Sequence, residues 1–313
     1  MTDRARVLFM GTPDFAAPIL RALLETPAVF DVVGLVSQPD RPAGRGRKLA
    51  PTPTKQVALE FDVPVFQPTK VKTDETRELL AQTQPDIAVV AAYGRILPLG
   101  LLELPRMGCV NVHASLLPRH RGASPITHAI LDGDSDAGVC LMRMDEGLDT
   151  GPVYARRSIP IAPNDTTATL SDKLADLGAQ IVVEELPGVL DGSLEAVAQV
   201  DEEATYAALM KKEDGYLDFS RPAAELERAI RAYQPWPVAS FEHGEARVQV
   251  GSALVESVTG PPGLVLSADK HGVLVACGEG SLRMVQVKPP GKRMMEAAAW
   301  VAGRGIAPDD QLR

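Results

Sequence analysis

The first half of the chain alternates short, wholly apolar runs with segments of helical spacing, and this alternation constrains the fold more than any other feature. A run that is apolar at every position fits a strand buried on both faces, as strands of a parallel sheet are. Such runs occupy residues 7–10, 32–36, 87–92 and 109–112, and a helix is expected over residues 15–25. The pattern therefore predicts an α/β fold with a Rossmann-like, parallel-rich sheet.

The turn after the first predicted strand argues against a dinucleotide cofactor. It reads GTPDFA at residues 11–16 and lacks the G-x-G-x-x-G spacing that lets the backbone approach a pyrophosphate. Binding of NAD is therefore disfavoured. In open α/β sheets, ligands bind beyond the carboxyl ends of the strands, and we expect a different ligand there.

A long helix is expected to close this half of the chain. Asp165 or Thr166 can cap its start, and apolar residues recur on one face until Pro187 and Gly188. Pro187 removes a backbone donor, so the helix is predicted to end there.

The composition of the chain changes after residue 205. The stretch 206–222 is charged and broken by glycine and proline, which is typical of a linker. A helix is expected over residues 223–232, followed by five short alternating stretches at 238–241, 246–250, 263–267, 272–276 and 281–287. These predict a small antiparallel, OB-like barrel. The expected organisation is a Rossmann-like domain over 1–205, a linker over 206–222 and an OB-like domain over 223–313.

Asn111 and His113 stand two residues apart in NVHASLLPRHRGASP, and Asp149 follows in GLDTG. On a strand, residues i and i+2 point to the same face, so a carboxamide and an imidazole lie side by side while Val112 faces the core. Two such donors stabilise the negative charge that develops when an acyl group is attacked. The trio predicts an acyl-transfer site in which Asp149 orients the imidazole. An isolated Asn-x-His also arises by chance, as an ordinary structural pair.

Composition narrows the class of protein further. The net charge of −9 argues against wholesale nucleic-acid binding through overall electrostatics, although local basic patches can still bind phosphate. Cys109, Cys140 and Cys277 lack C-x-x-C spacing and are expected to be buried free thiols in a reducing cytosol, with no metal site. No run approaches a membrane span and no signal-peptide core is evident, so a cytoplasmic protein is expected.

The strings NVHASLLPRHRGASPI at residues 111–126 and MDEGLDTG at residues 144–151 together resemble the folate-dependent formyltransferases. In that family an Asn, a His and an Asp carry formyl transfer from 10-formyltetrahydrofolate. The resemblance implies that Asn111 and His113 are oxyanion donors. It implies that Asp149 orients His113 and receives or relays the proton of the attacking amine. His120 departs from the family, which more often has an aromatic residue such as Trp there.

The resemblance also implies residues that hold the folate. SLLP of the family is matched by Ser115, Leu116, Leu117 and Pro118. Candidates for the pterin pocket are Phe15, Gly94, Ile96 and Leu97. Ordinary turn and core roles are equally compatible with this second group.

Nearly the whole chain is similar to the branch of the family that acts on methionyl-tRNA. The matching strings include VLFMGTPDFA, QPDRPAGRGRKLAPTPTK, KKEDGYLDF, IRAYQPWPVA and VQVKPPGKRMM. This implies formylation of the α-amino group of initiator methionyl-tRNA, for translation initiation, by a monomer. The implied tRNA contacts are Arg41, Arg45, Arg47 and Lys48 in a basic loop, and Lys288, Lys292 and Arg293 near the carboxyl end.

Three alternatives stay open at this point. The first is a formyltransferase for a small amine, such as an amino sugar, which needs neither the basic loop nor the second domain. The second is a hydrolase that releases formate when water replaces the amine. The third is a tRNA-binding protein without catalysis, which gains nothing from the three polar side chains.

Overall fold

The computed structural model describes residues 4–43, 48–303 and 305–312, and its internal contacts divide the chain into two compact units. The amino-terminal unit comprises Met1–Pro125, Asp136–Pro160 and Ser171–Ala208. The carboxyl-terminal unit comprises Ile126–Ser135, Ile161–Leu170 and Leu209–Arg313, so it includes two short segments from the first half of the chain. The domain boundaries expected from the sequence, at residues 205 and 223, stay a prediction.

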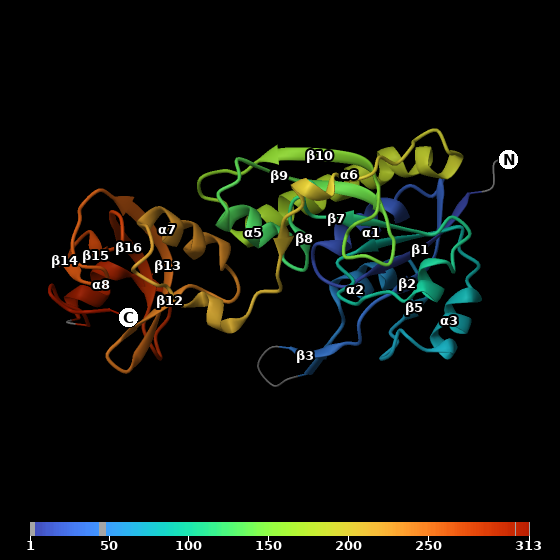
Figure 1. Cartoon of the computed structure of the whole chain (residues 1–313). Coiled ribbons are helices and arrows are strands. Elements are labelled where there is room, and N and C mark those ends of the chain that lie inside the picture. The colour runs from blue at the N-terminus through green and yellow to red at the C-terminus, as the bar shows by residue number, and fades with distance from the viewer. Residues whose placement is uncertain (1–3, 44–47, 304, 313) are drawn as a thin grey trace. The chain divides into compact units, whose positions relative to one another are not determined.

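A seven-stranded sheet forms the centre of the amino-terminal unit (Figure 1). Its strands are β1 (Ala5–Gly11), β2 (Phe30–Val36), β5 (Val65–Phe66), β6 (Ile87–Ala91), β7 (Cys109–His113), β9 (Asp136–Arg143) and β10 (Val153–Pro160). The order is β10-β9-β7-β6-β1-β2-β5. The five strands from β7 to β5 are parallel, which confirms the predicted α/β class with a mostly parallel sheet. The antiparallel edge formed by β9 and β10 was not predicted.

The helices of this unit include α1 (Ala16–Leu24), α2 (Pro53–Glu60), α3 (Asp74–Ala81), α4 (Leu99–Leu102) and α6 (Thr167–Asp191), whose first turn belongs to the other unit. The prediction that the long helix ends at Pro187 and Gly188 is wrong, because α6 continues to Asp191. Leu186 and Val189 are both buried, so the apolar face extends past the proline. Their burial offsets the lost hydrogen bond and ring clash, which cost about 3 kcal/mol in a helix interior.

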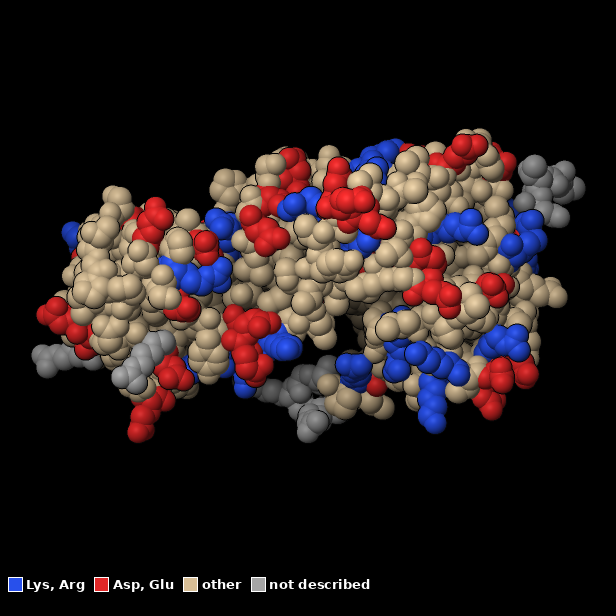
Figure 2. Space-filling model, viewed as in Figure 1, with Lys and Arg blue, Asp and Glu red and all other residues tan. Residues whose placement is uncertain are grey.

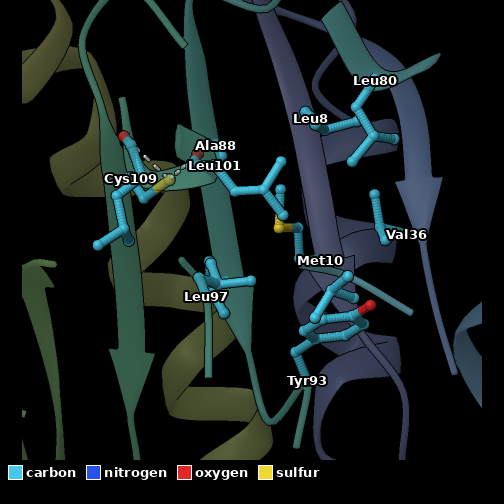
Figure 3. Packing of buried hydrophobic residues seen from close by; sticks show 12 residues of the cluster. Leu8, Met10, Val36, Leu80, Ala88, Tyr93, Leu97, Leu101 and Cys109 are labelled. Carbon is cyan, nitrogen blue, oxygen red and sulfur yellow. Dashed lines mark hydrogen bonds between the residues drawn. The ribbon is translucent and has the colours of Figure 1, made fainter. Parts of the chain in front are cut away.

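Two layers of helices sandwich this sheet. On one face, a Cβ added to Gly178 of α6 would lie 3.0 Å from Ile19 of α1 and 3.1 Å from Val112 of β7, so these three elements pack closely. On the other face lies a buried cluster contributed by the strands, α3, α4 and the turn after β6 (Figure 3). Its labelled members are Leu8, Met10, Val36, Leu80, Ala88, Tyr93, Leu97, Leu101 and Cys109.

The Tyr93 hydroxyl is the exception within this apolar cluster. Tyr93 is 2% exposed, burial raises its pKa, and its hydroxyl has no hydrogen-bond partner among the described residues. A buried hydroxyl without a partner costs desolvation energy that phenylalanine avoids in the same shape. We expect Tyr93→Phe to raise the free energy of unfolding by about 1 kcal/mol.

Chemical denaturation measures this change. Both tryptophans, Trp236 and Trp300, lie in the carboxyl-terminal unit, so far-ultraviolet circular dichroism is a better probe than fluorescence. Tyr216→Phe is the control, because it removes a hydroxyl from a residue that is 43% exposed and should change nothing. A loss of stability in Tyr93→Phe would show that the hydroxyl is satisfied in solution, for instance by a buried water.

The carboxyl-terminal unit is built on a curled antiparallel sheet (Figure 1). Its strands are β12 (Ser240–His243), β13 (Ala246–Glu256), β14 (Val265–Asp269), β15 (Gly272–Ala276), β16 (Ser281–Lys288) and β17 (Met295–Glu296). The order is β12-β13-β16-β15-β14, and β17 pairs with β16. Its helices include α5 (Pro125–Leu131), α7 (Ala223–Ala232) and α8 (Ala297–Ala302). The predicted helix over 223–232 and the predicted β-rich character are confirmed.

Short elements complete the fold. β3 (Arg41–Ala43) and β4 (Lys48–Ala50) pair antiparallel, and β8 (Arg121–Gly122) pairs in parallel with β11 (Tyr206–Ala207). Two 3-10 turns, η1 (Asp201–Glu203) and η2 (Lys212–Gly215), lie on either side of β11 in the chain. The expected linker therefore begins with a paired strand.

Candidate active site

β7 presents Asn111 and His113 at its carboxyl end, on the face of the sheet opposite to α1 and α6. Val112 is 1% exposed and packs against α6, and alternation along the strand turns its two neighbours the other way. His113 is 6% exposed, whereas Asn111 is half-buried. Within the described part of the chain, the Asn111 carboxamide has no hydrogen-bond partner. Its two N–H donors are therefore available to a ligand.

Asp149 lies beside His113, although the two are 36 positions apart in the sequence. The distance from His113 Nδ1 to Asp149 Oδ1 is 3.7 Å, an ion-pair separation that is longer than a hydrogen bond. The other carboxylate oxygen, Oδ2, accepts the backbone N–H of Gly122 at 2.8 Å. The carboxylate is thus held on one side and faces the imidazole on the other.

The second imidazole nitrogen also faces an acceptor. His113 Nε2 is 3.1 Å from the backbone carbonyl oxygen of His120, which only accepts, so Nε2 carries the proton and donates. His120 is buried and has a φ of +58°, so its backbone takes a tight turn here. An oxyanion bound by His113 has to share or replace one of these two contacts, as is common when a site tightens around its substrate.

Gln199 is a residue of this site that the sequence did not reveal. Its amide Nε2 donates to the carbonyl of Asp149 at 2.8 Å and to that of Gly151 at 2.7 Å. Thr205 was missed as well, and its hydroxyl accepts the backbone N–H of His120 at 2.9 Å. Neither residue stands in a motif, and both reach the site only through the folded path of residues 199–207.

The SLLP segment forms the loop directly after β7. The Ser115 hydroxyl donates to the carbonyl of Arg119 at 2.7 Å, which closes the loop on itself. Leu117 is 2% exposed and packs in a small cluster with Cys140, Met142 and Val153. Leu116 and Pro118 are only half-buried. Two of the four residues therefore hold the loop, and the other two are open to a ligand.

The pterin-pocket candidates lie where the strand order reverses between β1 and β6, the place at which open α/β sheets bind ligands. Phe15 and Leu97 are 7% and 6% exposed and belong to the core. Ile96 is 75% exposed, and Gly94 is exposed with a φ of +74°. A side chain would strain the backbone at this positive φ, so the turn favours glycine.

The strands β3 and β4 form the base of the basic loop. Asp40, just before β3, accepts from Lys55 Nζ at 2.6 Å and from Gln67 Nε2 at 2.7 Å. These bonds, that of Gln67 first, lower the pKa of Asp40 below its usual value. Arg41 is exposed and donates to Gln38 Oε1 at 2.8 Å. Arg45 and Arg47 lie outside the described residues, and of Lys48 only the backbone is described.

Lys and Arg gather on the side of the amino-terminal unit where β3 lies, although acidic residues are scattered over the same face of the molecule (Figure 2). This distribution fits a net negative chain that keeps local basic patches.

The second basic cluster lines a groove within the carboxyl-terminal unit. The groove has a volume of about 550 Å³ and includes Lys288, Lys292 and Arg293 among its walls. Gln234 and Gln249 add polar groups, and the rest of the lining is largely apolar. Three cations around a groove of this size suit an anionic ligand such as a phosphate.

The three cysteines are buried free thiols. Burial raises the pKa of Cys109 to about 12 and those of Cys140 and Cys277 to about 11, so all three stay protonated near neutral pH. Among residues 4–43, 48–303 and 305–312, no group of His, Cys, Asp and Glu side chains is arranged to hold a metal ion. No helix within the same residues is long and apolar enough to cross a membrane.

Solved structures share the fold of this chain. The N-formyltransferase of Helicobacter canadensis, solved with folinic acid and dTDP-3-aminofucose, matches with a TM-score of 0.65 and 16% identity, over 90% of this chain and 99% of that one. HypX of Aquifex aeolicus, solved with tetrahydrofolic acid, matches with a TM-score of 0.62 and 19% identity, over 96% of this chain. The match covers 47% of HypX, so this chain spans about half of that protein.

Sequence comparisons identify much nearer relatives. Family models for "Formyl transferase" and "Formyl transferase, C-terminal domain" match residues 4–186 and 209–305. The methionyl-tRNA formyltransferase of Myxococcus xanthus is 50% identical over 309 residues, which are 99% of this chain and 98% of that protein. That of Marinobacter nauticus is 48% identical over 290 residues, 92% of this chain and 93% of that protein. The chain therefore belongs to the formyltransferase family and, within it, to the methionyl-tRNA formyltransferases.

Proposed function

We propose that this enzyme transfers the formyl group of 10-formyltetrahydrofolate to the α-amino group of initiator methionyl-tRNA. The observation that carries the proposal is the placement of Asn111, His113 and Asp149 around the carboxyl end of β7, in a chain 50% identical to a methionyl-tRNA formyltransferase over nearly its whole length. The product, N-formylmethionyl-tRNA, serves translation initiation. The reaction is accordingly placed in the cytoplasm.

The chemistry follows from the three polar groups. The unprotonated amine attacks the formyl carbon, and the carbonyl oxygen takes up negative charge, which the free donors of Asn111 and the imidazole of His113 stabilise. The bond from the formyl carbon to N10 of the folate then breaks as N10 takes up a proton, and the nitrogen of the attacking amine loses one. Asp149 is the nearest described carboxylate to His113 and serves as acceptor or relay for that proton. No covalent enzyme intermediate is needed.

The folate is assigned to the carboxyl ends of β1, β6 and β7. The half-buried Leu116 and Pro118 and the exposed Gly94 and Ile96 offer surface to it, while Ser115, Leu117, Phe15 and Leu97 shape the loops behind. Support comes from two solved neighbours of the same fold, which bind tetrahydrofolic acid and folinic acid.

The tRNA is assigned to two basic surfaces, one in each unit. The loop carries Arg41, Arg45, Arg47 and Lys48, and the groove carries Lys288, Lys292 and Arg293. The curled sheet behind the groove is assigned an OB-like topology, a fold that often binds nucleic acid. The enzyme is proposed to act as a monomer, with a catalytic domain over 1–205, a linker over 206–222 and a tRNA-binding domain over 223–313.

A formylation assay tests the proposal. Purified enzyme and 10-formyltetrahydrofolate are incubated with charged initiator methionyl-tRNA, charged elongator methionyl-tRNA, free methionine, an amino-sugar nucleotide or no acceptor. We expect rapid formylation of the initiator tRNA alone. Formylation of the amino sugar would identify a small-amine enzyme, and formate release without formylation would identify a hydrolase. No turnover with any acceptor would leave a binding role.

A further inference from the structure

A buried arginine stands behind the turn that carries Asp149. Arg121 is 2% exposed, and its Nε and Nη2 donate to Gln199 Oε1 at 3.1 and 2.9 Å. Arg121 Nη2 also donates to Asp201 at 2.8 Å. These bonds fix the Gln199 amide so that its Nε2 points at the carbonyls of Asp149 and Gly151, at 2.8 and 2.7 Å. Gln199 therefore spans the DTG turn, with Arg121 as its support.

The backbone of Asp149 needs such support. Its φ is +53°, in the left-handed region that residues other than glycine adopt at a cost. The carboxylate touches His113 at 3.7 Å and accepts the N–H of Gly122 at 2.8 Å. A shift of the turn would therefore move Oδ1 relative to the imidazole. Bonds from one side chain to the carbonyls on both sides of Thr150 resist that shift.

The same stretch of chain also holds the other partner of His113. Thr205 accepts the backbone N–H of His120, whose carbonyl accepts Nε2–H of His113. The N–H of Arg121 donates to the carbonyl of Thr205 at 2.8 Å, and β8 pairs with β11 just beyond. Residues 199–207 thus form a segment that fixes the two groups on either side of the imidazole, the Asp149 carboxylate and the His120 carbonyl.

We propose that Gln199, held by the buried Arg121, is a positioning residue that fixes Asp149 at its working distance from His113. This inference rests on the proposed function for the part that Asp149 plays in turnover. Gln199 itself does not touch substrate, since both ends of its amide are taken by protein groups. Its effect on the reaction must therefore pass through Asp149.

A double-mutant cycle distinguishes positioning from a general loss of stability. Gln199→Glu keeps the size of the side chain and an acceptor for Arg121, but turns a carboxylate oxygen toward two carbonyls. We expect it to lower kcat by roughly tenfold or more, with KM for both substrates within about twofold. In an Asp149→Asn background the same change should alter kcat by less than about twofold, because the group that it positions is already disabled.

Gln311→Leu is the matched control. Gln311 Nε2 likewise donates to two backbone carbonyls, those of Pro262 at 2.9 Å and Leu312 at 3.3 Å, in the carboxyl-terminal unit. Its loss should leave kcat unchanged. Gln199→Leu, which removes both hydrogen-bonding ends, should repeat the effect of Gln199→Glu if it folds.

A readout that needs no turnover accompanies the kinetics. The Gly122 N–H is bonded to Asp149, so its hydrogen exchange should accelerate by about tenfold in Gln199→Glu and stay unchanged in Gln311→Leu. Equal losses of kcat in both backgrounds, an unchanged kcat in the wild-type background, or unchanged Gly122 exchange would overturn the proposal. If the wild-type enzyme formylates no methionyl-tRNA, the proposed function fails, and Gly122 exchange alone still shows whether Gln199 holds the turn.

Discussion

Replacing His113 or Asp149 by alanine is expected to lower kcat by on the order of 10² or more, while the affinity for methionyl-tRNA stays within about twofold of wild type. The reason is that both groups act on charge that develops only during the reaction. His113 is 6% exposed and lies between the carbonyl of His120 and the carboxylate of Asp149, so it has little surface to offer a macromolecule. Single-turnover formylation and a separate tRNA-binding titration measure the two quantities.

Asp149→Asn separates the charge of Asp149 from its structural bond. The amide oxygen still accepts the Gly122 N–H, which the carboxylate accepts at 2.8 Å, but the side chain no longer takes up a proton. We expect its turnover to fall nearly as far as that of Asp149→Ala.

His243→Ala is the matched control for this experiment. Its Nε2 lies 3.1 Å from Asp310 in the carboxyl-terminal unit, so it forms a His–Asp pair outside the proposed site. Below its unfolding temperature this variant should keep wild-type kcat. If His113→Ala and Asp149→Ala instead lost tRNA affinity at unchanged kcat, the pair would be a structural part of the tRNA-binding surface.

The central sheet was predictable because its signal is local. A parallel strand is covered on both faces, so each strand appears as an unbroken apolar run, and Ile87–Ala91 is buried at every position. The same reasoning explains why the antiparallel direction of β9 was not predicted. Residues 137–142 are all buried as well, but an apolar run does not encode strand direction or order. That β9 runs antiparallel beside β7 follows from the path of the chain around it.

The candidate site divides in the same way. That Asn111 and His113 point to the same face follows from strand alternation, so their spacing in the sequence was enough to predict it. The pairing of Asp149 with His113 was proposed from the residue types and supported by the family resemblance, since nothing local links residues 36 positions apart. Neither strand alternation nor the family resemblance predicted Gln199. It lies 50 residues beyond Asp149, and its position follows from the pairing of Val197 with Val153 and of β8 with β11.

The double change Arg45→Ala and Arg47→Ala is expected to raise the KM for tRNA by roughly tenfold or more and to flatten its salt dependence. Cationic side chains that contact phosphates release counterions, and the loss of two contacts should reduce the slope of log K against log salt by roughly 1.5. Asp40, Lys55 and Gln67 hold the chain just before β3, so the loop starts from a fixed point. Because the net charge is −9, binding depends on such local patches.

The control removes the same two positive charges elsewhere in the amino-terminal unit. Arg77 and Arg106 have exposed side chains and lie 3.7 Å from Asp74 and 3.0 Å from Asp86, so Arg77→Ala with Arg106→Ala changes the net charge equally. If the loop arginines contact phosphates, only their loss lowers the slope. Equal changes of the salt slope in both double variants would mean that tRNA binding responds to the overall charge of the enzyme. An unchanged slope in the loop variant would reject the contact between the loop arginines and phosphates. Throughout, kcat at saturating tRNA should stay near wild type, because the loop binds the substrate without taking part in the attack on the formyl carbon.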